Sequence, residues 1–111
     1  MRVETTREKR AQVLRPHGVM AGADAEMFEH QVRDALEGGT RDLVIDISQL
    51  AFVDSRGLEA LVGLAELQIR NGRTIKLAGD QPIVREVLEL TELSPLFQSF
   101  RDVNSALESI G

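Results

Sequence analysis

Strand-like and helix-like hydrophobic patterns alternate along this chain, with only short connections between them. The clearest strand pattern is the β-branched run at residues 43–47, and the clearest helical pattern follows at residues 58–69. Short strand–helix–strand crossovers are right-handed and return to the same sheet, so this order favours a mainly parallel sheet faced by helices. The alternation therefore predicts an α/β fold.

The other elements are predicted from periodicity, capping residues and turn residues. Further strands are expected at residues 3–5, 11–14, 74–78 and 96–100. Further helices are expected at residues 25–36, 82–90 and 103–110. Asp24 is expected to cap the first of these helices and Gly38-Gly39 to end it, while residues 16–18 and 21–23 are expected to form loops. The prediction is one domain over residues 1–111, with a mixed, mainly parallel sheet of four to five strands faced by about four helices.

The composition argues against several classes of function. The chain has no Cys and only two His, so thiol chemistry, a disulfide framework and a metal site are not expected. Thirteen Lys and Arg stand against eighteen Asp and Glu, for a formal net charge of −5, and there is no Trp or Tyr to stack on bases. Nucleic acid is therefore not an expected partner, and no cofactor is expected.

Nothing in the sequence indicates insertion into a membrane. No apolar run approaches the length of about 18 residues that a membrane span needs, because Asp46, Gln49 and Asp54 interrupt the best stretch. The first five residues, Met-Arg-Val-Glu-Thr, include two charged side chains and lack the apolar segment of a secretory signal. We therefore expect a cytoplasmic protein.

The most informative segment is Asp54-Ser55-Arg56-Gly57-Leu58, which lies where an apolar strand gives way to the long helix. In open α/β sheets, such junctions lie at the sheet edge where ligands and partners meet the fold. Two interpretations remain open from the residues alone. Asp54 or Ser55 caps the helix and does nothing more, or Ser55 presents a functional hydroxyl at this edge.

With the apolar strand before it, this motif resembles that of the STAS domain family, and in particular of the bacterial anti-sigma factor antagonists. The resemblance covers nearly the whole chain, through Gly18, residues 43–47, the motif, Asn71-Gly72, residues 93–97 and residues 105–107. It implies a single STAS-like domain and a protein that binds partners without catalysing a reaction.

The resemblance also implies a role for Ser55. In the antagonists, the serine after the motif's aspartate is phosphorylated by a serine kinase that is itself the anti-sigma factor. The unphosphorylated antagonist binds this kinase and frees the sigma factor, phosphorylation ends the binding, and a phosphatase restores it. Ser55 is thus the expected phosphoacceptor of a monomeric regulator. The expected partner-binding residues are Gly18, Asp24, Asp54, Arg56, Gly57, Leu58, Ala60 and Leu64.

Three positions depart from the family pattern. Arg56 stands where a small residue is usual, Ala21 where an acidic residue is common, and Glu92 where Gly is frequent. Arg56 is suited to pairing with a phosphate on Ser55 or with acidic groups of a partner. A second function stays open, in which the chain is an unphosphorylated subunit of an ABC-type lipid transport complex or a scaffold of a sensory assembly.

Two further alternatives concern the long helix and the histidines. The broad apolar face of residues 58–69 predicts core packing or, for Ala60, Leu64 and Leu67, partial exposure to a partner helix. A hydrolase triad that joins Ser55 to His17 is not expected, because no oxyanion-hole sequence accompanies these residues.

Overall fold

The computed structural model describes residues 1–36 and 41–110, and it confirms the α/β fold with a sheet of six strands. The strands are β1 (Arg2–Glu8), β2 (Ala11–Met20), β3 (Asp42–Asp46), β4 (Leu50–Val53), β5 (Ile75–Ala78) and β6 (Phe97–Phe100). The helices of the described residues are α1 (Gly22–Ala35), α2 (Ser55–Arg70), α3 (Pro82–Leu90) and α4 (Val103–Glu108), with a short 3-10 helix, η1 (Ser94–Leu96). None of these helices is long and apolar enough to cross a membrane.

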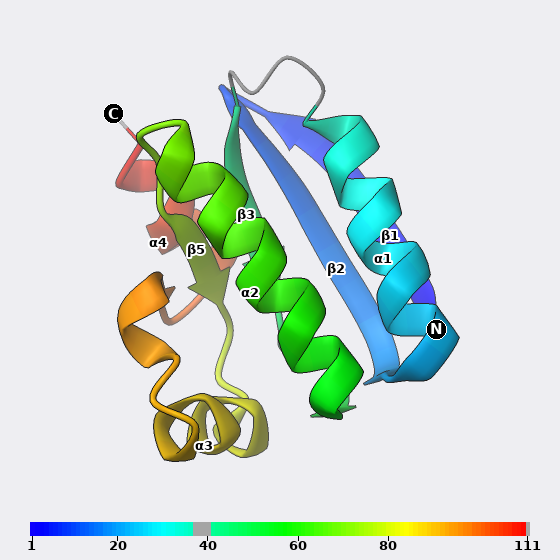
Figure 1. Cartoon of the computed structure of the whole chain (residues 1–111). Helices are drawn as coiled ribbons and strands as arrows, with labels where there is room; N and C mark the ends of the chain where they lie inside the picture. Colours follow the sequence, from blue (N-terminus) through cyan, green and yellow to red (C-terminus); the bar gives the residue numbers. More distant parts are fainter. Residues whose placement is uncertain (37–40, 111) are drawn as a thin grey trace.

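The sheet is mixed and mainly parallel, as predicted. Its strand order is β1-β2-β3-β5-β6, and β4 pairs with β2 beyond the end of β3. Only β1 runs antiparallel to its neighbour, because a two-residue turn joins it directly to β2. In Figure 1, α1 and α2 lie side by side across one face of the sheet, and both begin at the same end of the molecule.

Alternation along the strands divides the apolar side chains between the two faces of the sheet. In β3, Leu43 and Ile45 point into the main core, which α1 and α2 cover, whereas Val44 joins a smaller cluster under α4. Phe28 of α1 and Leu61 of α2 are almost completely buried in the main core. This packing fixes the starts of α1 and α2 against the carboxyl ends of β2 and β4.

β2 is longer than the sequence predicted, because it continues through Pro16, His17 and Gly18 instead of forming a loop there. A proline inside a strand loses a backbone donor. Pro16 is paired with Val3 of the edge strand β1, and on the other side of β2 it lies between Leu14, the last residue paired with β3, and Gly18, the first paired with β4, so it falls outside both parallel ladders. Gly18 has a φ of 99° at the register shift that follows, a conformation that favours glycine.

Two other expectations about element boundaries were wrong. The segment at residues 50–53 forms β4, which raises the number of strands from the predicted four or five to six. The helix cap predicted at Asp24 is also wrong, since α1 begins at Gly22 with Ala21 as its N-cap. Asp24 lies in the first turn, where its carboxylate is 3.1 Å from the N-terminal ammonium of Met1. The predicted stop at Gly38-Gly39 lies outside the described residues.

Candidate functional site

Asp54 joins the starts of α1 and α2. It is the N-cap of α2, and its Oδ1 accepts a hydrogen bond from the Gly57 N–H at 2.8 Å. Its Oδ2 accepts a second hydrogen bond from the Gly22 N–H of α1 at 3.2 Å. One carboxylate therefore satisfies an N-terminal donor of each helix. The sequence left open whether Asp54 or Ser55 caps α2. In the structure Asp54 is the cap, and the Ser55 side chain takes no part in capping.

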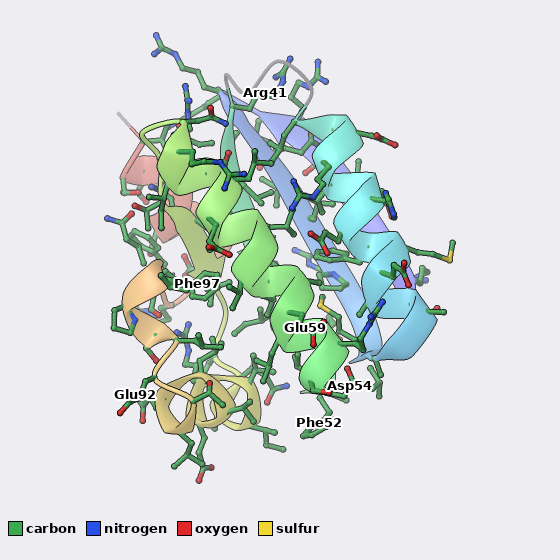
Figure 2. All side chains as sticks on the ribbon, in the orientation of Figure 1. Arg41, Phe52, Asp54, Glu59, Glu92 and Phe97 are labelled. Carbon is green, nitrogen blue, oxygen red and sulfur yellow. The ribbon has the colours of Figure 1, made fainter. Side chains whose placement is uncertain are left out.

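Ser55 is the first residue of α2 and is exposed to solvent. Within the described part of the chain, its hydroxyl makes no hydrogen bond to another group of the protein. Figure 2 shows Asp54 at the N-terminal end of α2, with Phe52 beside it and Glu59 further along the helix. The serine thus lies at a capped helix start, with a hydroxyl oxygen that no described group of the protein engages.

Gly57 and Leu58 anchor this helix start to the sheet. Gly57 is buried, and a Cβ at this position would collide with the carbonyl oxygen of Met20 and with the Val53 side chain. Leu58 is half-buried and packs against the main core. The glycine of the motif is therefore required by the close approach of α2 to β2 and β4, and the leucine secures the same turn.

Arg56 points the other way, toward α1. Its Nη2 lies 2.7 Å from Oε2 of Glu26, and both side chains are about half exposed. The pair borders a charged hollow of about 310 Å³ between the two helices, into which the Glu29–Arg33 pair of α1 also projects. Glu26 and Arg56 are 30 residues apart in the sequence, and nothing in the chain order indicates this contact.

A second, mainly apolar hollow of about 500 Å³ runs along α2 from Ser55. Leu58, Val62 and Leu93 form its apolar part, while Glu59 and Glu66 also line it. Glu59 and Glu66 are seven residues apart and therefore on one side of the helix. The hollow offers a partner an apolar contact bordered by two carboxylates and adjacent to the serine.

The structure contradicts the expectation that Ala60 and Leu64 are exposed to a partner. Ala60 is 2% exposed and Leu64 is completely buried, because α2 turns these positions toward the main core. Leu67 is half-buried, and Ile69, predicted to be part of the core face, is 47% exposed. The core-packing alternative therefore holds for Ala60 and Leu64, and the accessible apolar surface nearest to Ser55 is that of Leu58 and Val62.

Gly18 and Asp24 do not lie within the motif at the start of α2. Gly18 is in β2, where its N–H donates to the carbonyl oxygen of Gln49 just before β4. Asp24 is paired with the N-terminal ammonium on α1. Neither residue makes a hydrogen bond or an ion pair with Asp54, Ser55 or Arg56 among the described residues.

His17 belongs to a different polar group, on the face of the sheet opposite α2. Its Nε2 lies 2.7 Å from the Glu4 carboxylate, which also pairs with Arg15. Arg15 in turn donates to the buried Asp46 at 2.7 Å. Burial acts to raise the pKa of Asp46, but hydrogen bonds from Ser48 and Arg15 outweigh it and hold the pKa below its usual value. His17 and the helix that carries Ser55 therefore lie on opposite faces of the sheet.

No cluster of three or more His, Cys, Asp or Glu suited to a metal ion occurs in the described ranges, 1–36 and 41–110. The groups assembled at the start of α2 are the free hydroxyl of Ser55, the helix-capping carboxylate of Asp54 and the Arg56–Glu26 ion pair, next to an apolar hollow. Such a set can bind a protein partner and can accept a phosphoryl group. These features define a class: a small α/β domain that presents a serine at the start of its second helix.

Comparison with known proteins identifies the family. The sequence matches the STAS domain over residues 2–106. The chain therefore belongs to the STAS domain family. A relative from Bordetella bronchiseptica, described as a candidate anti-sigma factor antagonist, BtrV, is 29% identical over 80 residues, which make up 72% of this chain and 69% of the relative.

Solved structures share the fold. A candidate anti-sigma factor antagonist from Thermotoga maritima has a TM-score of 0.89 and 21% identity, over 96% of this chain and 92% of that one. The Bacillus protein SpoIIAA, an anti-sigma factor antagonist, has a TM-score of 0.83 in its unphosphorylated form, with 20% identity over 98% of this chain and 96% of that one. Its phosphorylated form has a TM-score of 0.78 and 18% identity, over 99% and 100% of the two chains.

Proposed function

We propose that this protein is an anti-sigma factor antagonist that binds a kinase-type anti-sigma factor, and that phosphorylation of Ser55 ends the binding. The observation that carries the proposal is the placement of Ser55, an exposed hydroxyl without a hydrogen-bond partner among the described residues, at the first position of α2. The apolar hollow beside it supports the proposal, because one partner can cover both features at once. We propose that the protein acts in the cytoplasm as a monomer, and by binding, not by catalysis.

In the proposed phosphorylation, Ser55 Oγ attacks the γ-phosphorus of ATP that is bound to the kinase. The new O–P bond forms as the bond to the β-phosphate oxygen breaks, ADP leaves, and the hydroxyl proton passes to a base of the kinase. A phosphatase reverses the modification by hydrolysis, which returns the serine and inorganic phosphate. The STAS domain supplies the acceptor oxygen and its fixed position, and the kinase supplies the ATP.

The electrostatics of the helix start support a switch of this kind. A phosphate adds a charge of about −1.5 to −2, which the N-terminal end of a helix tolerates, so the fold need not change. In an interface, however, the same charge must lose its water and stands close to the carboxylates of Asp54 and Glu59. A penalty of about 3 kcal/mol is enough to weaken binding roughly a hundredfold.

The test is affinity capture from native lysate with four baits in parallel: wild type, Ser55→Ala, Ser55→Asp and Ser99→Asp. Ser99 is an exposed serine in β6 and serves as the control for an added charge. The proposal predicts that a kinase-like protein binds every bait except Ser55→Asp. Equal capture of transporter subunits or sensory scaffolds by all four baits would instead support the second function, in which Ser55 is not modified.

A further inference from the structure

Arg56 is held by a contact that is easily exchanged. It pairs with Glu26 of α1 at 2.7 Å, but the arginine is 49% exposed and the glutamate 57% exposed. An ion pair with so much exposure is weak, because water screens it and two long side chains must be ordered to form it. A stronger anion within reach of Arg56 would therefore compete successfully with Glu26.

A phosphate on Ser55 would be such an anion. It would carry up to two negative charges and would lie between the carboxylates of Asp54 and Glu59, the latter four residues further along the same helix. Guanidinium groups bind phosphate oxygens through two parallel hydrogen bonds, which makes this pairing stronger than a single contact to a carboxylate. Both the charge and the surroundings favour the recruitment of a cation.

The place of Arg56 in the helix permits the exchange. Consecutive residues of an α-helix point about 100° apart, so Arg56 faces the charged hollow and Ser55 the apolar one. Ser55 and Arg56 are, however, the first two residues of α2. No earlier turn of helix lies over them, and a long arginine side chain can swing across the helix end.

We propose that phosphorylation of Ser55 transfers Arg56 from Glu26 to the phosphate, so that the modification also breaks the ion pair between α1 and α2. This inference rests on the proposed function, since it needs a phosphate at Ser55. The released Glu26 carboxylate then adds to the negative surface at the start of the two helices. Aspartate at position 55 has a shorter side chain and a single charge, and it recruits Arg56 less well than phosphoserine does.

The test uses protein with phosphoserine incorporated at position 55 during translation, so no kinase is needed. ³¹P NMR follows the second ionisation of the phosphate, whose pKa is about 6 in an isolated phosphoserine. We expect the Arg56→Gln variant to raise this pKa by about half a pH unit relative to the parent, and Glu26→Gln to lower it. Arg33→Gln is the matched control, because Arg33 borders the same hollow but pairs with Glu29 of its own helix.

Equal shifts in Arg56→Gln and Arg33→Gln would overturn the inference, since the effect would then reflect net charge alone. No shift in Arg56→Gln would overturn it as well. Either result leaves the proposed function standing if the lysate capture succeeds. Conversely, the titration keeps its meaning if no kinase acts on Ser55, so the two failures are distinguishable.

Discussion

Removal of the Asp54 carboxylate is expected to destabilise the protein at both helix starts. In Asp54→Ala, the Gly57 N–H at 2.8 Å and the Gly22 N–H at 3.2 Å both lose their acceptor. Loss of an N-cap costs about 1 kcal/mol. The second, more exposed hydrogen bond to a charged group adds about another 1 kcal/mol. The free energy of unfolding should therefore fall by about 2 kcal/mol, which corresponds to a fall in Tm of roughly 10 °C.

Urea unfolding of the two proteins measures this loss, and hydrogen exchange locates it. The chain offers a matched control in Asp102, which caps α4 through one hydrogen bond, to the Ser105 N–H at 2.8 Å. Asp102→Ala should therefore lose less stability than Asp54→Ala. Exchange at the Gly22 amide should accelerate in Asp54→Ala and stay unchanged in Asp102→Ala. Equal losses of stability in the two variants, with no change at Gly22, would refute the idea that Asp54 joins α1 to α2.

The remaining predictions concern five other positions. Gly57→Ala should lower the unfolding free energy by about 1–3 kcal/mol in urea, because its Cβ meets the backbone at Met20; a neutral result would contradict the close approach of α2. Leu64→Ala should lower it by about 2–5 kcal/mol, whereas Val62→Ala, at a half-buried position, should lower it less and weaken partner capture more. Glu92→Gly should raise Tm, with a gain of about 0.5–1 kcal/mol, because Glu92 has a φ of 61° after α3; a lower Tm would show that its side chain compensates. The pKa of Asp46 is lower in the folded protein, so its contribution to stability is present at neutral pH and is lost as the pH falls through that pKa. Asp46→Asn should therefore lose less stability than wild type when the pH is lowered. If the urea midpoints of the two proteins fell equally on acidification, this prediction would be wrong.

Local signals in the sequence predicted the parts of the fold that depend on nearby residues. The β-branched run of β3, the cap-and-glycine motif at the start of α2 and the stop at Asn71-Gly72 all combine consistent short-range preferences. They were therefore located to within a few residues. The same motif predicts Ser55 at the start of a helix, where the structure has it.

The errors have a common cause, in that each depended on contacts between distant segments. A proline interrupts a strand where a neighbouring strand needs the N–H donor that proline lacks. The local sequence does not show that Pro16 lies in the gap between β3 and β4 along β2. The burial of Ala60 and Leu64 depends on how α2 is rotated against the sheet. The Arg56–Glu26 pair joins residues 30 positions apart, so no spacing rule predicts it.

The most direct test of the central claim is to find where phosphate is attached in protein recovered from its native cells. Trypsin should release residues 42–56 as one peptide, because Arg41 precedes it and Arg56 ends it. This peptide contains two serines, Ser48 and Ser55, so fragment-ion mass spectrometry compares them within one molecule. The account predicts phosphate on Ser55 and none on Ser48. Phosphate on Ser48 alone, or an unmodified peptide in cells where the captured kinase is active, would contradict it.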